Sequence, residues 1–351
     1  MKYYLKEEFL HDVNAKNAGN KARNDVESIV KEEGYHPLVL SVDNWYQMST
    51  LAAQRHKAKA FGQALDQLKQ GDELLIQFPM LHHSFFSTHL VKKAQKRGIK
   101  VYLLIHDLEV LRHANMTSLP LKHRIRMYLQ EASFLKAADG IIAHNPVMKS
   151  VLVDKGIAED KIVSLGIFDY LIPDFQEKSG QTKDQPIIVA GNLAQEKAGY
   201  LYKLPAEPSY NLYGVGFDEN RALLNETYFG SFLPDELPSV LEGGFGLVWD
   251  GDSADTCSGV FGEYLRFNNS HKASLYLASG FPLVVWKQSA LSRFVLENGC
   301  GIAVESLHDL KNTIENLSDA DYQEMIANAK NIGKKIRDGF YLTSALKELT
   351  K

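Results

Sequence analysis

Residues 268–286 have the sequence NNSHKASLYLASGFPLVVW, which combines a helix pattern, a tight turn and a short buried strand. Asn269 or Ser270 is a good N-cap for a helix over residues 271–278. A Gly-Phe-Pro turn then leads into the apolar run Pro282–Trp286, which has the length and composition of a strand buried on both faces. The stretch therefore predicts one helix-and-strand unit of a layered α/β fold.

The same alternation fills the first half of the chain. Short apolar runs suited to buried strands occur at Lys2–Leu5, Pro37–Val42, Glu73–Phe78, Lys100–His106, Gly140–His144 and Lys161–Leu165. Between these runs lie the amphipathic segments Asp25–Glu33, Leu51–Lys69, Ser84–Arg97 and Leu121–Ala137. The first three are followed by a glycine suited to a helix C-cap. Strand–helix alternation with right-handed crossovers predicts a doubly wound parallel sheet.

A polar stretch over residues 173–186, with prolines at both ends, separates this half from a second one. Further candidate strands are Ile187–Ala190, Tyr210–Gly214, Gly246–Trp249 and Gly301–Val304, and further candidate helices are Pro234–Leu241, Ala290–Glu297 and Asp319–Ile332. We therefore predict an N-terminal domain over 1–172, a linker over 173–186 and a C-terminal domain over 187–336. An amphipathic helix over 337–351 is expected to return to the N-terminal domain. The expected fold class is α/β, with two Rossmann-like domains facing a cleft and ligands beyond the carboxyl ends of the strands.

Composition excludes several classes of protein. The 351 residues carry 39 Lys and Arg against 43 Asp and Glu, a formal net charge of −4, which argues against nucleic acid as the main partner. The two cysteines, Cys257 and Cys300, form neither a CxxC motif nor a disulfide framework. Walker A, HExxH and GxSxG motifs are absent, as is a GxGxxG after the first strand of either half. A polar N-terminus and the lack of a long apolar run favour a cytoplasmic protein.

The start of the helix over 271–278 is the first candidate ligand site. Cations are disfavoured at a helix N-terminus, so Lys272 in the first turn suggests that an anion such as a diphosphate shares the position. His271, Asn268 and Asn269 lie beside it in sequence and would complete a cradle. A surface N-cap with a solvated lysine explains the pattern equally well.

Other polar residues follow predicted strands. Gly191 and Asn192 close the first strand of the second half, and Lys197 follows at a distance suited to phosphate contact. Asp250 ends a glycine-rich strand and could accept hydrogen bonds from sugar hydroxyls. Taken alone, each is also explained by a turn with an Asx cap or by a solvated lysine.

In the first half, the polar loop after the first strand contains Gly19, Asn20 and Lys21, where a ligand-facing loop is expected. The fourth strand ends in His106 and Asp107, and an aspartate at that position is a plausible general base. A helix over 121–137 begins with the basic residues Lys122, His123, Arg124 and Arg126. Such a helix can rest on anionic lipid, although most are ordinary solvated faces.

The ordered set of these segments resembles bacterial glycosyltransferases of GT-B architecture. It is similar to the β-1,6-galactofuranosyltransferase group and, more distantly, to the glucosyltransferases that extend sugars on serine-rich adhesins. The segments that carry the resemblance are residues 17–25, 105–112, 191–193, 245–251 and 268–280. Ser270 departs from the galactofuranosyltransferase pattern, where proline is found. Gln195-Glu196 departs from the adhesin enzymes, which have an arginine that Lys197 could replace.

The resemblance implies a metal-independent hexosyltransferase, without a cofactor, that uses a UDP-sugar donor carrying galactofuranose, glucose or galactose. Residues expected to bind donor or acceptor are Gly19, Asn20, Lys21, Gly191, Asn192, Lys197, Phe232, Asp250, Asn268, Asn269, His271 and Lys272. Phe232 would stack on uracil, and Lys272 would stabilise the departing UDP. Asp107 would be the base for the acceptor hydroxyl if the enzyme inverts configuration, and would only orient the acceptor if it retains it.

Two other functions stay open at this point. A UDP-sugar epimerase on the same fold would need paired acid/base carboxylates, which the sequence does not offer convincingly. A catalytically silent, sugar-binding accessory subunit would keep the fold and lose the phosphate cradle. For the transferase, the expected acceptor is a saccharide, with a lipid-linked or a protein-linked one both open, in cell-surface polysaccharide or glycoprotein synthesis. A homo-oligomer and a peripheral position on the inner membrane face are both compatible with the sequence.

Overall fold

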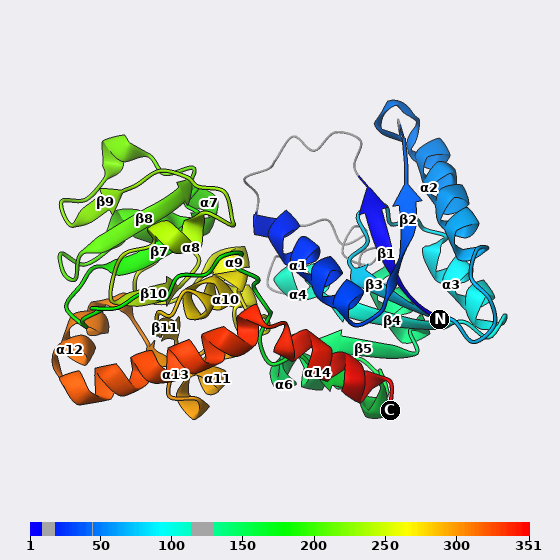
Figure 1. Cartoon of the computed structure of the whole chain (residues 1–351). Helices are drawn as coiled ribbons and strands as arrows, with labels where there is room; N and C mark the ends of the chain where they lie inside the picture. The colour runs from blue at the N-terminus through cyan, green and yellow to red at the C-terminus, as the bar shows by residue number, and fades with distance from the viewer. Residues whose placement is uncertain (9–17, 44, 114–129) are drawn as a thin grey trace. The chain divides into compact units, whose positions relative to one another are not determined.

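The computed structural model describes residues 1–8, 18–43, 45–113 and 130–351. The chain divides into two compact units, each built on one parallel sheet (Figure 1). The first unit comprises the described residues of 1–14, 26–165 and 342–351, and the second those of 15–25 and 166–341. The two six-stranded sheets confirm the predicted α/β class with two Rossmann-like halves.

The first unit is a parallel sheet in the order β2-β1-β3-β4-β5-β6 among the described residues. Its strands are β1 (Lys2–Glu8), β2 (His36–Ser41), β3 (Glu73–Phe78), β4 (Lys100–Ile105), β5 (Gly140–Ala143) and β6 (Ile162–Ser164). Its helices are α1 (Ala18–Glu32), α2 (Thr50–Leu65), α3 (Ser87–Gln95), α4 (Glu109–Arg112), α6 (Pro146–Asp154) and α14 (Phe340–Leu349), and residues 130–137 are also helical. The first turns of α1, up to Asp25, and the first two residues of α14 belong to the second unit.

The central strands of this sheet are buried on both faces, as their continuous apolar sequences require. Residues 74–76 of β3 and 103–105 of β4 are all fully buried. The C-terminal helix α14 packs against the same unit, because a Cβ added at Gly140 would lie 2.7 Å from the side chain of Leu349. A glycine in β5 therefore lets α14 approach the strand.

The second unit is a parallel sheet in the order β12-β11-β10-β7-β8-β9. Its strands are β7 (Ile187–Asn192), β8 (Tyr210–Val215), β9 (Glu226–Tyr228), β10 (Phe245–Val248), β11 (Leu283–Trp286) and β12 (Gly301–Val304). Its helices are α7 (Gln195–Ala198), α8 (Leu237–Val240), α9 (Gly259–Tyr264), α10 (His271–Ala278), α11 (Leu291–Glu297), α12 (Leu310–Glu315) and α13 (Asp319–Arg337). The stretch quoted first thus forms α10 and β11 as predicted.

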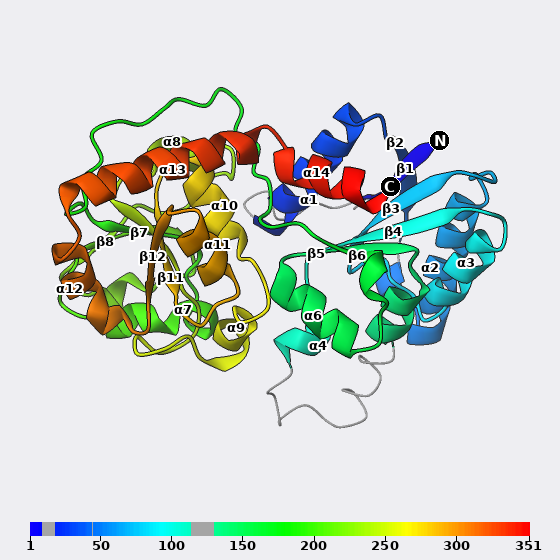
Figure 2. The same cartoon turned by 90° about the horizontal axis from the view of Figure 1, so that it is seen from below.

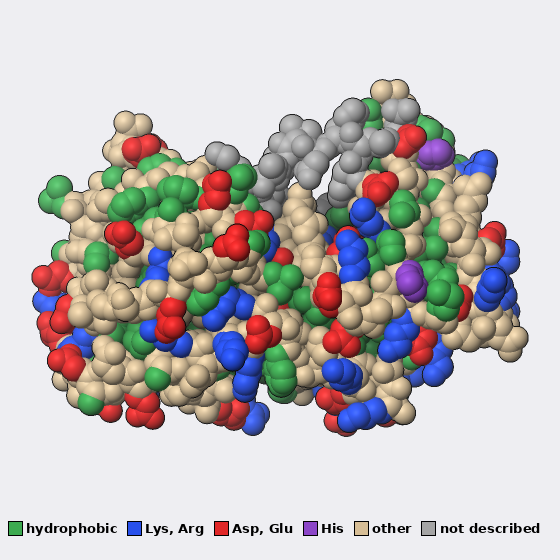
Figure 3. Space-filling model, viewed as in Figure 1, with side chains coloured by type: hydrophobic (Ala, Val, Ile, Leu, Met, Phe, Trp, Pro, Cys, Tyr) green, Lys and Arg blue, Asp and Glu red, His purple; other side chains and the backbone are tan. Residues whose placement is uncertain are grey.

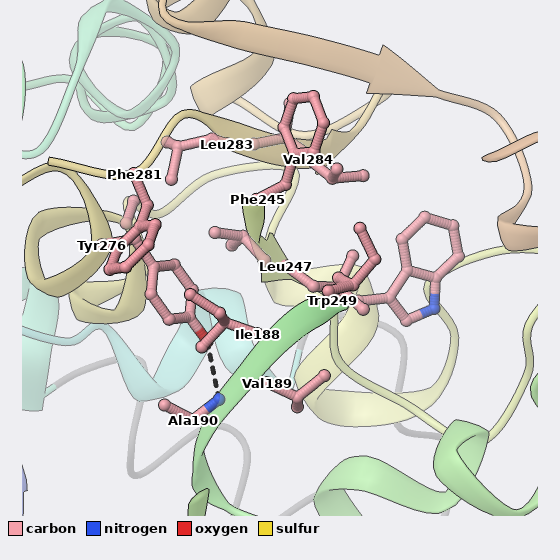
Figure 4. Close-up of a cluster of buried hydrophobic side chains, with 14 of the residues drawn as sticks. Ile188, Val189, Ala190, Phe245, Leu247, Trp249, Tyr276, Phe281, Leu283 and Val284 are labelled. Atoms are coloured by element: carbon pink, nitrogen blue, oxygen red, sulfur yellow. Dashed lines mark hydrogen bonds between the residues drawn. The ribbon is translucent and has the colours of Figure 1, made fainter. Parts of the chain in front are cut away.

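Helix α10 is fixed to the sheet by Tyr276. The backbone N–H of Ala190 in β7 donates a hydrogen bond of 2.7 Å to the Tyr276 hydroxyl (Figure 4). A Cβ added at Gly246 in β10 would lie 2.2 Å from the Tyr276 ring, so only glycine leaves room for that ring. The start of α10 is therefore held at a defined place relative to β7 and β10.

Helix α13 packs on the other side of α10 (Figure 2). A Cβ added at Gly333 would lie 2.1 Å from the carbonyl oxygen of Leu277, which shows how closely the two backbones approach. The two cysteines, Cys257 and Cys300, are free and fully buried in the core of this unit. Burial raises the pKa of both thiols, to about 12 for Cys300.

The structure differs from the sequence predictions in several details. Strand β9 and helices α6, α9 and α12 were not predicted, and α8 is shorter than expected. Residues 18–25 and 166–172 are grouped with the second unit, whereas the predicted boundary placed them in the first. The predicted basic helix start at residues 122–126 and most of the predicted polar loop before Gly19 lie outside the described residues. No helix in the described part of the chain is long and apolar enough to cross a membrane.

Candidate functional site

The ends of β7 and β10 and the start of α10 meet around the side chain of Lys272. Its Nζ donates hydrogen bonds of 2.8 Å to the carbonyl oxygen of Trp249 and 2.8 Å to Oδ1 of Asp250. Both charged side chains are largely buried, with 15% of Lys272 and 7% of Asp250 exposed. The lysine thus reaches from the helix start to the carboxyl end of β10, where ligands of open α/β sheets bind.

Gly191 lies beside the stem of this lysine. A Cβ added at Gly191 would be 3.8 Å from Cδ of Lys272, and its φ of +125° favours glycine. An ammonium group has three N–H donors. Within the described part of the chain, two of them are used in the contacts with Trp249 and Asp250, which leaves one donor for a ligand oxygen.

Two buried polar atoms at the start of α10 have no hydrogen-bond partner among the described residues. They are Oδ1 of Asn268 and Nε2 of His271. Asn269, by contrast, donates a bond of 2.6 Å to the carbonyl oxygen of Gly166. Ser270 is the N-cap residue, but its side chain makes no capping bond. Both atoms are acceptors, and unpaired acceptors in such a place are what a site that awaits a hydroxyl-bearing ligand would show.

The His271 ring is packed between aromatic side chains. Its centroid lies 5.1 Å from that of Tyr170 and 6.0 Å from that of Phe168. Burial, with a smaller contribution from the charge of Lys21, lowers the pKa of His271 to about 4, despite a hydrogen bond with the backbone of Asp169. The imidazole is therefore neutral near pH 7 and can serve as a hydrogen-bonding group, not as a cation.

The other predicted residues on this edge are less enclosed. Asn192 is exposed, and its Oδ1 accepts a bond of 2.9 Å from the N–H of Ala194. Lys197, in the short helix α7, has its Nζ 5.4 Å from the ring centre of Phe261. The structure therefore brings Asp250 into direct contact with Lys272 and places Gly191 beside the stem of that lysine, while Lys197 lies beside an aromatic ring.

Aromatic side chains gather at the ends of β8 and β9. Tyr213 stacks on Phe229 with centroids 4.9 Å apart and lies tilted against Phe232 at 6.3 Å. Phe232 packs partly on the core, whereas Phe229 is 43% exposed. Hydrophobic side chains are visible on this part of the surface in Figure 3. The sequence analysis chose Phe232 and missed Phe229, because Phe229 follows the unpredicted strand β9.

Lys21 is enclosed by groups of the second unit. Its Nζ lies 2.7 Å from Oδ1 of Asp25, 2.8 Å from Oδ1 of Asp235 and 2.7 Å from the carbonyl oxygen of Leu171. It also lies 4.9 Å from the ring centre of Tyr170. Burial raises the pKa of Asp25 to about 6, against the lowering effect of Lys21. Gly19 and Asn20 precede it in the first turn of α1. Lys21 belongs to the second unit, and Asp107 belongs to the first.

Asp107 follows β4 in the first unit. Its Oδ1 lies 2.6 Å from Nη2 of Arg112. Next to it, Nε2 of His106 is 2.8 Å from Oε1 of Gln77, at the end of the neighbouring strand β3. Sequence reasoning did not select Arg112, although it lies five residues after Asp107 within the segment 105–112 that carries the family resemblance.

The arrangement can do two kinds of chemistry. The second unit offers a cation and a helix N-terminus, which suit an anionic leaving group, and two unpaired acceptor atoms, which suit hydroxyl donors. The first unit offers a carboxylate held by an arginine, which suits orientation or deprotonation of a hydroxyl. In the described part of the chain, no group of three or more His, Cys, Asp and Glu side chains is placed to hold a metal ion.

Comparison with protein families gives two matches that together cover most of the chain. Residues 2–167 match the N-terminal domain described as glucosyltransferase 3-like, and residues 187–349 match the C-terminal domain of the same description.

Among curated proteins, the chain is 33% identical over 354 residues to the β-1,6-galactofuranosyltransferase WbbI of Escherichia coli K12, covering 97% of each chain. It is 25% identical over 331 residues to glucosyltransferase 3 of Streptococcus gordonii, covering 93% of this chain and 92% of that one.

Solved structures with the same fold include a sucrose-phosphate synthase from Thermosynechococcus elongatus, with a TM-score of 0.62 and 14% identity over 99% of this chain and 96% of that one. Another is WaaG, a glycosyltransferase involved in lipopolysaccharide biosynthesis, with a TM-score of 0.57 and 10% identity over 98% of both chains. These likenesses confirm the predicted GT-B architecture.

Proposed function

We propose that the chain, which belongs to the glucosyltransferase 3-like family, transfers a hexose from a UDP-sugar to a saccharide acceptor in the synthesis of a cell-surface polysaccharide or glycoprotein. Its family membership makes it a glycosyltransferase. The observation that carries the donor assignment is the contact of Lys272 with the end of β10 beside Gly191. The relatives' names suggest galactofuranose or glucose as the transferred sugar.

In this proposal the second unit holds the donor. The third N–H of Lys272 and the backbone N–H groups at the start of α10 would bind the diphosphate. The unpaired Oδ1 of Asn268 and Nε2 of His271 are acceptors, so they would accept hydrogen bonds from donor hydroxyls. Negative charge grows on UDP as the glycosidic bond breaks, so a cation fixed at that point stabilises the transition state more than the ground state. Asp250 would orient Lys272 and accept donor hydroxyls with its remaining lone pairs. Phe232 and Phe229 would offer an aromatic surface to uracil.

The acceptor would be bound by the first unit. Asp107, held by Arg112, would take the proton of the attacking hydroxyl if configuration inverts. If configuration is retained, a donor phosphate oxygen would take that proton and Asp107 would orient the acceptor. Lys21 is already engaged by two carboxylates, so we propose that it fixes the first turn of α1, which carries Gly19 and Asn20.

Transfer would need neither a cofactor nor a metal ion, because Lys272 and the helix N-terminus supply the positive charge at the leaving group. In this proposal the saccharide acceptor is linked to a lipid or to a protein. The enzyme would act in the cytoplasm, at or near the inner membrane face, and would be able to form a homo-oligomer.

A thermal-shift series tests the donor class. UDP at 100 times its dissociation constant should stabilise the protein by about 2.7 kcal/mol, whereas uridine alone should do far less because it lacks the diphosphate. UDP-galactofuranose, UDP-glucose and UDP-galactose should be compared in the same buffer, with EDTA present. Transfer to a saccharide, followed by release of UDP, should also persist in EDTA. No shift with UDP would overturn the donor assignment, while UDP binding without transfer to any acceptor would favour an accessory subunit.

A further inference from the structure

The proposed base, Asp107, depends on a helix of a single turn. Helix α4 starts two residues after Asp107 and carries both Glu109 and Arg112. Nη2 of Arg112 lies 2.6 Å from Asp107, and Nη1 lies 2.7 Å from Oε1 of Glu109. The position of the guanidinium group against Asp107 therefore follows the position of α4.

One turn of helix is not stable by itself, because nucleation costs more than one hydrogen bond returns. Its first N–H groups also have no partners within the helix. In this structure Oε1 of Glu131 accepts a bond of 2.7 Å from the N–H of Glu109, and Oε2 accepts one of 3.0 Å from the N–H of Val110. A single carboxylate, from a helical segment 22 residues further along, thus caps the two N–H groups at the start of α4.

The Glu131 carboxylate sits in mostly apolar surroundings. The pocket around it is lined by Leu108, Val110, Leu111, Ala132, Leu135, Leu152 and Ile157, with Lys136 and Lys155 as its charged members besides Glu131 itself. Burial raises the pKa of Glu131 to about 7; the backbone bonds and Arg112 act against that rise, and Glu109 adds to it. The charge of this carboxylate therefore changes close to neutral pH.

We infer that Glu131 is a positioning residue for the transfer reaction: its carboxylate caps α4 and thereby holds Arg112 against Asp107. This inference rests on the proposed function for the role of Asp107, but not on the identity of the donor sugar. The ionised form accepts both N–H bonds. The protonated form keeps one carbonyl oxygen as a good acceptor and turns the other oxygen into a hydroxyl, so it caps α4 less well.

A double-mutant cycle tests whether Glu131 acts through Arg112. Glu131→Gln should lower kcat about 10-fold and leave KM for the UDP-sugar unchanged, because the donor residues lie in the other unit. Arg112→Ala should also lower kcat, and the double variant should be no slower than Arg112→Ala alone, since residues acting through one contact are not additive. If the losses of kcat in the two single variants multiplied in the double variant, the inference would be overturned. The matched control is Glu159→Gln, because the Glu159 carboxylate is exposed and lies 3.7 Å from Nζ of Lys149 in the same unit. This change should leave both kcat and KM as in the wild type.

A pH series adds a readout that a merely structural role would not move. Between pH 6 and 8, kcat of the wild type should rise with an apparent pKa near 7 as Glu131 ionises, and this rise should be missing in Glu131→Gln. The rise persisting unchanged in Glu131→Gln would overturn the inference.

Hydrogen exchange separates this inference from the proposed function. Relative to their intrinsic exchange rates at each pH, the amides of Glu109 and Val110 should be strongly protected at pH 8, less protected at pH 6, and unprotected at both pH values in Glu131→Gln, whether or not any sugar is transferred. Equal protection in the variant would show that Glu131 does not hold α4. If Asp107→Asn transfers sugar at the wild-type rate, the positioning role is overturned while the donor site in the second unit stands.

Discussion

Lys272 and Asp250 form a buried ion pair at the point where the leaving group is proposed to bind. Replacing Lys272 by alanine should lower kcat by about 10²-fold or more, the size expected for one lost contact to a developing oxyanion. Steady-state kinetics with a saturating UDP-sugar would measure this loss. Because the change also leaves Asp250 buried without its cation, circular dichroism and thermal unfolding must show that the variant is folded.

Lys197→Ala is the matched control, since Lys197 lies on the same edge of the sheet but its amine is beside the ring of Phe261. We expect a much smaller loss of kcat from this change. A folded Lys272→Ala variant with wild-type turnover would contradict the role proposed for Lys272.

At the residue scale the sequence selected candidate side chains but did not predict which of them touch. Lys272 at a helix start and Asp250 at a strand end were both selected, yet nothing in a separation of 22 residues predicts their bond. The contact depends on how the α10 start is held over β10, which is set by tertiary packing. The pair of Lys21 with Asp25 is a local one, four residues apart in α1, but the contact of Lys21 with Asp235 depends on tertiary packing in the same way. The functional roles of these residues stay predictions.

At the scale of elements, α10 is held by the fit of Tyr276 over Gly246. Gly246→Ala would place a methyl group about where the Tyr276 ring lies, so the ring or the helix must move. Overpacking of this kind typically costs 1–3 kcal/mol, and we expect about 2 kcal/mol of lost stability, measured by urea unfolding. UDP affinity should fall with it, because the start of α10 moves.

Gly180→Ala is a useful control, because a Cβ at Gly180 meets nothing within 4 Å. Its φ of +78° still adds some backbone strain, so its loss of stability should be smaller, and its UDP affinity should be unchanged. A Gly246→Ala variant as stable as the wild type would show that the ring is not held as described.

Most elements were predictable because buried parallel strands have continuous apolar sequences. Strands β3 and β12 and helix α10 have the predicted bounds. Strand β9 was missed because its three residues, Glu-Thr-Tyr, are short, polar and at the sheet edge. Helix α8 is shorter than predicted because Pro234 and Pro238 both occur within the expected span, and the regular helix begins only at Leu237.

At the scale of the whole molecule, the sequence predicted two parallel-sheet halves and the glycosyltransferase family, and both are confirmed. It did not predict that residues 18–25 are grouped with the second unit. That grouping depends on contacts such as the bond from Lys21 to the carbonyl oxygen of Leu171, which link residues 150 positions apart. Local patterns carry no information on such pairs.

Both thiols, Cys257 and Cys300, are buried in the second unit and have raised pKa values, so their reactivity reports how often that unit opens. A thiol reagent can modify these cysteines only when the fold opens. When labelling is slower than reclosing of the fold, the labelling rate is proportional to the population of open molecules. UDP at 100 times its dissociation constant should slow labelling about 100-fold, as followed by mass spectrometry. Unchanged labelling would place UDP outside the second unit. The unmodified protein therefore carries its own probe of where the nucleotide binds.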